Sequence, residues 1–383
     1  MSANKNFDAI VIGAGIVGAS SALALTNAGL RVLVLDRGAV ASGTTGAGEG
    51  NILVSDKEPG PELTLALRSR DLWFELREDV GDSFELEAKG GVVVSRGDDR
   101  QLQEFADKQR FAGVDVRVVG DEELHELEPH LTRGVNSGIL YPQDAQCQPM
   151  LAAAQFLKIV RQRGGEVRTS ANVTNIFSAM GKVTGIETSV GKFSTPIVVN
   201  ATGTWAGDIA KLAGTFLPIA PRKGFILVTA PMPQIINHKV YDSDYVANVA
   251  SGEADLQTST VVEGTRSGTI LIGASRERIG FDGSMNIDVL RRLAAQATSL
   301  FPILRDVQLL RAYRGFRPYA PDHLPVIGED SLISGLWHSA GHEGAGIGLA
   351  PGSARLIADQ IIGAEPFMDP TPFSPGRFQA GAA

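Results

Sequence analysis

The chain has 383 residues, which is more than one simple core usually holds, so we expect one large domain or two interleaved domains. Its formal net charge of −8 argues against a general nucleic-acid-binding protein. The single cysteine, Cys147, excludes an internal disulfide and has no Cys or His neighbour at metal-ligand spacing, so no metal site is expected. These features are typical of a protein of a reducing compartment, and we expect a cytoplasmic location.

The apolar stretch 9–25 could be mistaken for a signal peptide. Asp8 stands where such a peptide has basic residues, and three glycines interrupt the run, so no targeting signal is expected. No other uninterrupted apolar segment is long enough to span a bilayer, and we expect no integral membrane segment.

The first elements have the order strand, helix, strand. Residues 7–13 (FDAIVIG) are typical of a buried strand, residues 16–29 of a helix that ends at Gly29 in the C′ position, and residues 31–37 (RVLVLDR) of a second buried strand. This order within about 30 residues indicates the start of a doubly wound sheet. The glycine-rich loop 43–51 (GTTGAGEGN) follows, and a helical pattern covers 61–80.

The rest of the chain alternates between two kinds of pattern. Residues 84–142 mix short strands with polar helices, and residues 216–316 are mostly strands with one helix near 286–300. Between them, a helix at 149–165 leads into strands at 166–177 (EVRTSANVTNIF), 182–189 and 195–203, and the chain closes with a strand, a glycine loop and a helix. We therefore predict an α/β fold in which a discontinuous nucleotide-binding domain (1–83, 145–215 and 325–365) is interrupted by a mainly antiparallel second domain (84–144 and 216–324), with a C-terminal tail at 366–383.

The first motif carries the signature of a dinucleotide site. In Gly13-Ala14-Gly15-Ile16-Val17-Gly18, the first glycine permits a tight turn, the second lets a pyrophosphate approach the backbone, and the third allows close packing of helix on strand. The helix N-terminus adds amide groups and a positive dipole end. Asp36 closes the second strand, 21 residues after Gly15, where a carboxylate can accept both ribose hydroxyls of an adenosine. A tight turn without a ligand would leave Asp36 unexplained.

The glycine motif does not separate NAD from FAD, but other segments favour FAD. The loop 43–51 offers the hydroxyls of Thr44 and Thr45, and the strand 198–203 (VVNATG) runs into another glycine turn. The segment 341–348 (GHEGAGIG) is a second glycine loop before a second helix. The dipole of that helix would stabilise a flavin ring, which gains negative charge on reduction.

Five motifs together resemble a known family. The N-terminal fingerprint, the Thr/Gly loop, NATGTWAGDIA, GFRPYAPDHLPVIG and GHEGAGIGLAPGSARLIADQI follow the order found in the FAD-dependent family of D-amino-acid oxidase, glycine oxidase and sarcosine oxidase. The match spans nearly the whole chain, and it is most similar to the bacterial branch with glycine oxidase, D-amino-acid dehydrogenase and subunits of opine or D-hydroxyproline dehydrogenases. The resemblance implies a Rossmann-like domain that binds FAD and an antiparallel sheet that roofs the flavin.

The motifs also indicate which residues hold the cofactor. The expected FAD-binding set is Gly13, Ala14, Gly15, Ile16, Val17, Gly18, Asp36, Arg37, Thr44, Thr45, Gly48, Glu49, Gly50, Asn51, Val173, Ala201, Thr202, Gly203, Trp205, Gly341, Glu343, Gly344, Ala345, Gly346 and Ile347. Trp205 is expected to pack under the nucleotide. Glu49 and Glu343 have two open interpretations, since each could contact a substrate amine or a ribityl hydroxyl, or could simply favour a helix start.

The resemblance places an arginine that clamps the substrate carboxylate at Arg317, in GFRP. A guanidinium pairs with a carboxylate through two parallel hydrogen bonds. Arg314 lies three residues earlier, so in a strand it should point to the opposite face, where we expect it to be a structural ion-pair partner. The alternative is that both arginines are structural. His342 is a second candidate catalytic residue, with the alternative that its loop serves only through backbone geometry.

Several positions depart from the family pattern. Sarcosine oxidases carry the cysteine that attaches flavin close to the position of Gly315, and none is present here, so FAD should be noncovalent. Relatives similar to glycine oxidase place a tyrosine on the roof sheet. No aromatic residue lies near 258–265, although Tyr241 and Tyr245 lie upstream. Cys147 is expected to be a small buried residue rather than a nucleophile.

The resemblance implies an FAD-dependent oxidoreductase that acts on the C–N bond of a small amino acid: a D-amino acid, glycine, or an N-substituted derivative such as D-hydroxyproline or sarcosine. Hydride transfer to the flavin would give an imine, which hydrolyses to a 2-oxo acid or, for a cyclic amine, remains in the ring. Three alternatives stay open: a flavin subunit that passes electrons to partner subunits, a nicotinamide-dependent dehydrogenase, and a non-catalytic FAD-binding protein. The expected partners are the substrate and either partner subunits or another electron acceptor, with oligomer formation left open and no nucleic acid.

Overall fold

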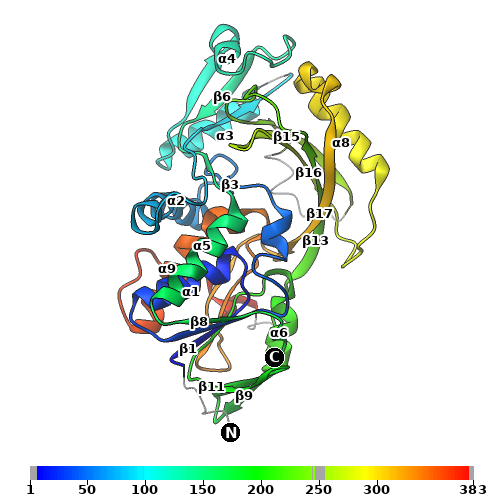
Figure 1. Cartoon of the computed structure of the whole chain (residues 1–383). Helices are drawn as coiled ribbons and strands as arrows, with labels where there is room; N and C mark the ends of the chain where they lie inside the picture. Colours follow the sequence, from blue (N-terminus) through cyan, green and yellow to red (C-terminus); the bar gives the residue numbers. More distant parts are fainter. Residues whose placement is uncertain (1–6, 98, 244, 246–254, 379–383) are drawn as a thin grey trace.

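The structure of the chain is a computed structural model, and it describes residues 7–97, 99–243, 245 and 255–378. Two large sheets organise the molecule, one in the lower half of Figure 1 and one, strongly curved, in the upper right. The residues of the predicted tail at 379–383 and the N-terminal residues 1–6 lie outside the described part.

The first large sheet has six strands in the order β18-β19-β12-β1-β2-β8. It comprises β1 (Ala9–Ile12), β2 (Val32–Leu35), β8 (Glu166–Arg168), β12 (Val198–Asn200), β19 (Leu336–Ala340) and β18 (Val326–Glu329). All neighbours are parallel except β18 and β19. Strand β1 lies in the middle, with the turn into α1 (Ile16–Asn27) at its carboxyl end, which is where doubly wound sheets bind ligands.

Both faces of this sheet are covered, because its central strands β1 and β2 are apolar and buried at every position. Ala9, Val11, Val32 and Val34 pack toward a helical layer, which Figure 1 shows as α1 with α2 (Pro61–Val80), α5 (Pro149–Gln162) and α9 (Gly346–Ile362). The alternate residues pack into a separate core with the small antiparallel sheet of β9 (Val173–Ala179), β10 (Lys182–Thr188) and β11 (Gly191–Ser194). Helix α6 (Ala206–Leu212) follows β12.

The second large sheet has eight strands in the order β17-β13-β16-β15-β14-β4-β6-β5. They are β4 (Gly91–Val94), β5 (Arg117–Gly120), β6 (Ser137–Tyr141), β13 (Ala220–Thr229), β14 (Lys239–Asp242), β15 (Gln257–Gly264), β16 (Ile270–Arg276) and β17 (Leu309–Tyr319). Its neighbours are antiparallel except β4 and β14.

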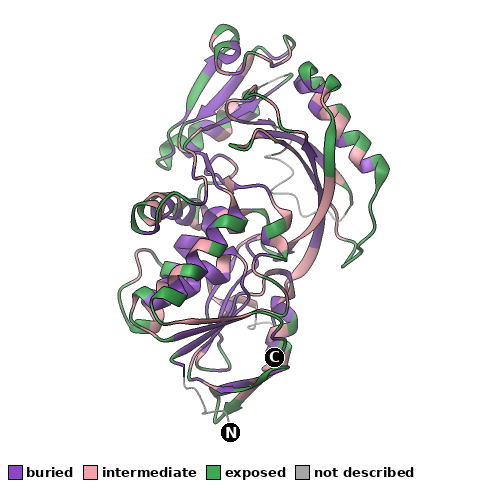
Figure 2. Cartoon of the chain, in the orientation of Figure 1, coloured by how far each residue is buried: buried purple, intermediate pink, exposed green. Residues whose placement is uncertain are grey.

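One helix covers the outer side of the curved sheet. Helix α8 (Ile287–Leu300) presents Val289, Leu293, Ala297 and Leu300, which share a helix face and pack in one core with Phe225, Leu227, Val262 and Ile272 of the sheet. Figure 2 shows the corresponding pattern, with a buried inner stripe and an exposed outer face on α8. Helices α3 (Arg100–Phe111) and α4 (Asp121–Leu127) lie at the other end of this sheet.

The remaining elements are short. They are the pair β3 (Asn51–Ile52) and β7 (Ala145–Gln146), and the 3₁₀ turns η1 (Thr44–Ala47), η2 (Gly203–Trp205), η3 (Pro302–Asp306), η4 (Glu343–Ala345), η5 (Thr371–Phe373) and η6 (Pro375–Phe378). Of these, η1 and η2 both hydrogen-bond the carbonyl of Phe316 on β17. The loops of the six-stranded sheet are therefore hydrogen-bonded at β17 to the eight-stranded sheet, which is called the roof sheet below.

The predicted fold class is confirmed: a parallel Rossmann-like sheet is combined with a mainly antiparallel second sheet. The exact domain boundaries stay a prediction. One predicted strand was wrong, because 166–177 divides into β8 and β9, which belong to different sheets. The predicted tail is packed at least to Phe378, since Phe373 is buried and Arg377 pairs with Asp322 at 2.7 Å.

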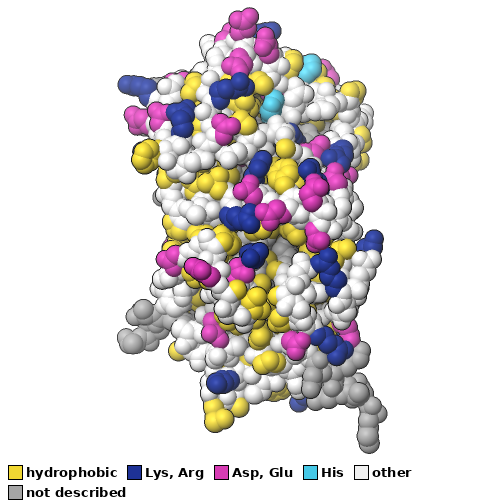
Figure 3. All heavy atoms as spheres, turned by 90° about the vertical axis from the view of Figure 1, so that its left-hand side faces the viewer, with side chains coloured by type: hydrophobic (Ala, Val, Ile, Leu, Met, Phe, Trp, Pro, Cys, Tyr) yellow, Lys and Arg dark blue, Asp and Glu magenta, His cyan; other side chains and the backbone are white. Residues whose placement is uncertain are grey.

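No helix in the described ranges is long and apolar enough to cross a bilayer. Figure 3 shows one side of the molecule, on which Lys and Arg side chains alternate with Asp and Glu side chains. No single-sign patch dominates that face.

Candidate functional site

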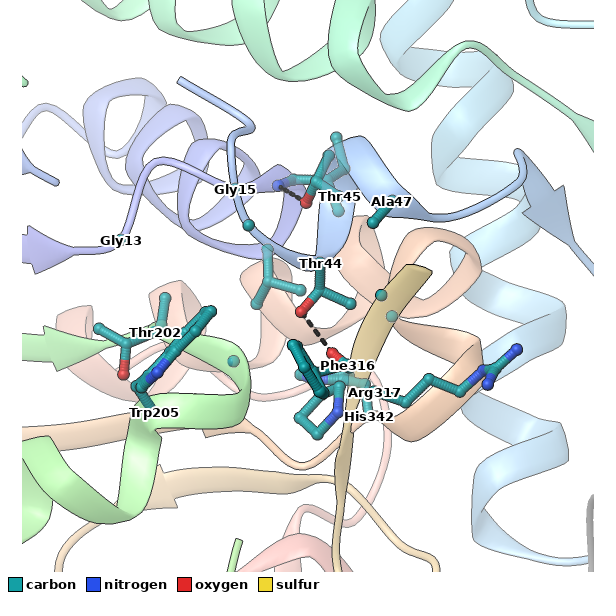
Figure 4. A pocket seen from close by; sticks show the side chains of 18 of the residues that line it. Gly13, Gly15, Thr44, Thr45, Ala47, Thr202, Trp205, Phe316, Arg317 and His342 are labelled. Atoms are coloured by element: carbon teal, nitrogen blue, oxygen red, sulfur yellow. Dashed lines mark hydrogen bonds between the residues drawn. The ribbon is translucent and has the colours of Figure 1, made fainter. Parts of the chain in front are cut away.

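A cavity of about 520 Å³ opens at the carboxyl end of β1, between the six-stranded sheet and the roof sheet. Loops from both sheets line it. In Figure 4, Gly13 and Gly15 lie on one side, Thr44 and Thr45 on the loop above, Trp205 at one end and Arg317 at the other. Segments far apart in the sequence thus meet around one elongated space.

The β1–α1 turn has the geometry that its glycines predict. Gly13 has φ +111°, and a Cβ there would overlap the carbonyl of Ala201 on the neighbouring strand. Gly18 lies against the carbonyl of Gly13, so a side chain there would push the helix away from the turn. Gly15 lines the cavity, where an added Cβ would lie 2.9 Å from the Thr45 hydroxyl. The backbone of Gly13 and Gly15 therefore forms part of the cavity wall directly, with no side chain in between.

Asp36 is held in place by the same turn. Its Oδ2 accepts a 2.7 Å hydrogen bond from the Ala14 amide, and its Oδ1 accepts one of 2.7 Å from the Gly38 amide. The carboxylate lines the cavity at the end of β2. Each oxygen keeps further lone pairs, so the group is fixed in position and still able to accept ribose hydroxyls.

The Thr/Gly loop contacts protein rather than leaving its hydroxyls free. Thr45 Oγ1 accepts a 3.0 Å hydrogen bond from the Ile16 amide in the first turn of α1, and Thr44 Oγ1 donates at 2.7 Å to the Phe316 carbonyl (Figure 4). Tyr313 Oη donates at 3.1 Å to the carbonyl of Gly48. The expectation that these threonines serve the cofactor through hydroxyl contacts stays a prediction, but their role in shaping the loop is visible.

An aromatic stack closes the end of the cavity opposite to Arg317. The Trp205 ring lies parallel to that of Phe281, with centroids 5.4 Å apart, and the Arg37 guanidinium lies 4.3 Å from the Trp205 ring centroid. Trp205 and Arg37 both line the cavity. The position agrees with packing against a nucleotide.

Most of the predicted cofactor-binding residues line this cavity. The exceptions are Ala14, Gly18, Gly50, Gly341 and Ala345. Gly50 lies against the Cys147 carbonyl and Gly341 against Ile219, so these two glycines serve close packing. Ala345 lines a smaller neighbouring cavity. Cys147 is buried, and burial raises the pKa of its thiol, which agrees with a structural role.

The second glycine loop carries an ion-pair network. Glu343 Oε1 pairs with the buried Arg222, and Glu343 Oε2 lies 3.0 Å from His323 Nδ1. Burial alone would raise the pKa of the Glu343 carboxyl, but His323 and Arg222 hold it below its usual value. Both carboxylate oxygens are thus occupied, and contact between Glu343 and a substrate amine remains only a prediction.

His342 is buried in the same loop. Its Nε2 lies 2.9 Å from the Ser353 hydroxyl on α9, and burial lowers the pKa of the imidazole to about 4. The ring is therefore neutral at pH 7. Although it lines the cavity, the structure leaves its catalytic role a prediction.

Glu49 belongs to a buried charge cluster that we did not predict. Its Oε2 accepts hydrogen bonds from Asn51 Nδ2 at 2.8 Å and Lys239 Nζ at 3.1 Å, and Lys239 also pairs with Glu263 at 2.8 Å. Burial raises the pKa of Glu49, but Lys239 and Asn51 more than offset this and keep it low. Glu49 Oε1 has no partner among the described residues and lies at the cavity wall.

The two arginines of β17 point to opposite faces. Arg317 lines the cavity together with Gly315, whereas Arg314 donates through Nε to the Gly283 carbonyl at 2.5 Å and lies near the Phe316 ring. The expected ion pair of Arg314 is wrong, because a carbonyl takes the place of a carboxylate within the described ranges. Alternation along the strand separated the two side chains, as expected.

The Arg317 side chain extends from β17 across β13 and is hydrogen-bonded to β16. Its Nη1 donates at 2.8 Å to the Ser275 carbonyl on β16, and the side chain crosses β13 at Gly224. A Cβ at Gly224 would overlap Nη1 and lie 3.0 Å from Cζ. The glycine inside the strand RKGFILVT was the available signal, since such a residue marks a close approach.

Tyr245 and Arg276 lie near Arg317, and of these two Arg276 was not predicted. Tyr245 lines the cavity, whereas Tyr241 is buried in a network with Ser55 and Asp144 away from it. Of the two tyrosines upstream of 258–265, Tyr245 therefore lines the cavity and Tyr241 does not. Arg276, at the end of β16, lies 5.0 Å from the Tyr245 ring centroid.

The donor set fits a dinucleotide. The turn at Gly13 and Gly15 leaves room for a pyrophosphate at the start of α1, Asp36 is placed for ribose hydroxyls, and the cavity continues past the loop 43–51 to Arg317. The described residues contain no group of three or more His, Cys, Asp or Glu side chains that could hold a metal ion.

Comparisons with known proteins agree with this site. The family model described as "FAD dependent oxidoreductase" (DAO) matches residues 8–360. The chain is 30% identical to a glycine oxidase of Pseudomonas aeruginosa, over 96% of this chain and 98% of that protein. It is 29% identical to the hydrogen cyanide synthase subunit HcnC of the same organism, over 98% and 97%.

A solved structure shares the fold over nearly the whole chain. The L-proline dehydrogenase from P. horikoshii has a TM-score of 0.89 and 25% identity, over 98% of this chain and 99% of that one. With the fingerprint turn, Asp36 and the long cavity in place, the chain belongs to the DAO family of FAD-dependent oxidoreductases, and FAD is its cofactor.

Proposed function

We propose that this oxidoreductase acts on the C–N bond of a small amino acid. The observation that carries the proposal is the Arg317 guanidinium, which lines the FAD cavity and has no carboxylate partner among the described residues. The names of two relatives, glycine oxidase and L-proline dehydrogenase, support it. D-Amino acids, glycine and N-substituted amino acids such as sarcosine are the substrates to test first.

Arg317 binds the substrate carboxylate in this proposal. One of its nitrogens is fixed by the Ser275 carbonyl, and a Cβ added at Gly344 would lie 3.8 Å from the Cδ of its aliphatic stem. The remaining N–H groups are the donors for a carboxylate, which a planar guanidinium binds in a fixed orientation. Holding the acid at this point fixes where the amine-bearing carbon lies, and orientation of this kind is a large part of catalysis.

The cofactor would be held by the turn Gly13–Gly18, Asp36, the loop 43–51, Trp205 and the start of α9. When bound, FAD would supply a two-electron acceptor for a hydride from the substrate carbon, with loss of a proton from the nitrogen, and the resulting imine would be hydrolysed by water. Tyr245 and Ile226 line the roof and limit water around the reacting carbon.

Attachment of the cofactor is proposed to be noncovalent. Gly315 lies next to the loop 43–51, and a Cβ at position 315 would lie 2.8 Å from Ala47 Cβ. A cysteine at 315 would therefore displace the loop rather than fit beside it. The check is acid precipitation of the yellow protein, which should leave all the flavin in the supernatant.

The experiment that tests the function is anaerobic mixing of the FAD-bound protein with a panel of D-, L- and N-alkyl amino acids, with flavin absorbance as the signal. We expect at least one amino acid to bleach the flavin, and the amine that lacks its carboxylate to bleach it far more slowly. If no member of the panel reduces the flavin, the proposal fails and a non-catalytic FAD-binding role gains support.

A second candidate is the flavin subunit of a heteromeric dehydrogenase. The similarity to a protein named as a subunit, HcnC, favours it. The distinguishing measurement is reoxidation of the substrate-reduced protein in air. Fast reoxidation supports an oxidase, whereas slow reoxidation that an artificial electron acceptor accelerates supports a dehydrogenase subunit.

A further inference from the structure

A second guanidinium lies next to Arg317 in the roof sheet. Arg276 is the last residue of β16 and is only 4% exposed. Its Nε and Nη1 have no hydrogen-bond partner within the part of the chain that the structure describes, and no ion pair is formed there. Leaving a buried guanidinium without an anion is costly, so its side chain needs an explanation beyond folding.

Strand geometry directs Arg276 toward the site. The Ser275 hydroxyl accepts a 2.9 Å hydrogen bond from the Phe225 amide, so Ser275 points to the opposite face from its neighbours. Ala274 and Arg276, on either side, share the face toward the interior space. Ala274 lines the FAD cavity, and Arg276 lines a smaller cavity of about 250 Å³.

The two cavities share a wall, and the Arg276 cavity is an extension of the site rather than a separate feature. Tyr245, Arg317, His342, Glu343 and Gly344 line both of them. The Ser275 carbonyl that holds Arg317 is in the residue directly before Arg276. A small molecule bound to Arg317 at the end of the FAD cavity can therefore extend toward Arg276.

The other buried cations of this region have carboxylate partners in the protein. Arg222 pairs with Glu343, Lys239 pairs with Glu49 and Glu263, and Lys57 pairs with Asp56 at 2.6 Å. The carboxylates of Glu343, Glu49, Glu263 and Asp56 are therefore already paired with cations other than Arg276.

The carboxylates that line the smaller cavity are engaged elsewhere or point outward. Asp56 and Glu62 both lie within 4 Å of Lys57 Nζ, Glu58 is exposed, and Glu343 is occupied by Arg222 and His323. Burial, together with Arg317 and Arg222, lowers the pKa of Arg276 to about 10, against the opposing effects of Tyr245 and Glu343, so the guanidinium is still charged at pH 7. Among the described residues, no carboxylate is therefore left to pair with Arg276, and this guanidinium is a candidate to bind an anion of the substrate.

We propose that the substrate is an amino acid with two carboxylates, of which Arg317 binds the one next to the amine-bearing carbon and Arg276 binds the second. The proposal rests on the proposed function and specifies its substrate class. The second carboxylate can be on the side chain, as in an acidic amino acid, or on the nitrogen, as in an N-carboxyalkyl amino acid. The oxidation itself would be the one proposed above, with loss of a hydride from the carbon and of a proton from the nitrogen, and bound FAD would supply the acceptor for the two electrons.

The binding test uses the FAD-bound protein and a matched pair of unreactive acids, succinate and butyrate, which have four carbons each and differ by one carboxylate. Calorimetric titration should show succinate binding about ten-fold or more tightly than butyrate. The Arg276→Met variant should lose this preference and keep its affinity for butyrate, while Arg276→Lys should keep part of it.

A surface variant controls for general loss of charge. Arg291 on α8 is exposed and pairs only locally with Asp288, so Arg291→Met should preserve the preference for succinate. Equal binding of succinate and butyrate by the parent protein overturns the proposal, as does an unchanged preference in Arg276→Met. If Arg276→Met does not retain FAD, the comparison in the parent protein and in Arg276→Lys decides.

Anaerobic flavin reduction separates the two sources of the second carboxylate. Aspartate and glutamate of both configurations test the side-chain position, and iminodiacetate and N-carboxymethylalanine test the nitrogen position, with alanine and sarcosine as neutral references. Faster reduction by either diacid group supports the proposal. Reduction by neutral amino acids alone overturns it and leaves the proposed function intact. If no amine reduces the flavin, the proposed function fails, and the succinate and butyrate titration still decides the role of Arg276.

Discussion

Arg317 on β17 crosses the neighbouring strand β13 directly over Gly224, and its guanidinium occupies the place where a side chain at 224 would begin. The absence of a Cβ at one residue thus sets the position of the charge at another. Substitution of Gly224 should therefore displace the Arg317 guanidinium and weaken carboxylate binding, with only a small effect on the rest of the sheet.

The Gly224→Ala variant should displace the Arg317 guanidinium, because an added Cβ would overlap Nη1. A shift of this kind can cost about 100-fold in catalytic efficiency for a carboxylate substrate. Anaerobic reduction kinetics and FAD content are the measurements. Gly134→Ala is the control, since nothing lies within 4 Å of a Cβ there. Unchanged kinetics in Gly224→Ala would contradict the position of Arg317.

The Arg317→Met variant should weaken binding of every carboxylate ligand by about 2–5 kcal/mol, the scale for loss of one partner from a buried charged pair. Arg314→Met is the matched control, because Arg314 is on the same strand but contacts the Gly283 carbonyl on the other face. Titration with butyrate measures both variants. Similar affinities for Arg317→Met and the parent protein would exclude Arg317 as the carboxylate anchor.

The Asp36→Ala variant should bind FAD more weakly. The change removes the acceptor of the Ala14 and Gly38 amides as well as the carboxylate expected to bind ribose. Loss of charged hydrogen bonds of this kind costs about 1.5–3 kcal/mol each. The dissociation constant of FAD, measured on apoprotein by fluorescence quenching, should rise accordingly. Asp8→Ala is the control, because Asp8 also accepts a backbone amide hydrogen bond, from Arg31, but is exposed.

The parts of the site that the sequence predicted are formed by residues that are close together in the chain. The turn at Gly13–Gly18 and Asp36 lie within one strand-helix-strand unit, so their spacing alone fixes how they meet. Lys239 on β14 and Arg276 on β16 were missed because their positions depend on how strands that are distant in the chain pair within the eight-stranded sheet. The ion pair expected for Arg314 failed for the same reason, since its partner, the Gly283 carbonyl, belongs to a loop whose position only the folded sheet determines.

Asp144 should make stability depend on pH. Burial raises the pKa of its carboxyl from 3.8 to about 6, although Ser55 and the Val54 amide donate hydrogen bonds to it. A raised pKa means that the folded state binds the proton more tightly, so the stabilisation is present below pH 4 and is lost as the pH rises to about 6. The shift corresponds to up to about 3 kcal/mol.

The measurement for Asp144 is the free energy of unfolding in urea between pH 4 and 7, compared with Asp144→Asn. His342, whose pKa is lowered to about 4, acts in the opposite direction in this range, so only the difference between the two proteins is informative. The parent protein should lose stability relative to the variant as the pH rises. A difference that is constant with pH would show that Asp144 does not titrate in this range.

Replacement of Lys239 should lower the stability of the protein more than replacement of any other residue in the buried charge cluster of Glu49, Lys239 and Glu263. The Lys239→Met variant leaves the Glu49 and Glu263 carboxylates buried without their cation, and breaking such a pair costs about 3–5 kcal/mol. The exposed pair of Lys192 and Glu187 is the control, for which Lys192→Met should cost at most about 1 kcal/mol.

The loss in Lys239→Met should also depend on pH. Lys239 keeps the pKa of Glu49 low against the effect of burial, so without Lys239 that pKa rises and the carboxyl can take up a proton in the folded state. The stability deficit of the variant should therefore shrink as the pH falls from 7 toward 5, as urea unfolding of the FAD-bound proteins can measure. Because Glu49 also lines the cavity, the same protonation should change the absorbance of bound FAD in the variant and leave it constant in the parent protein.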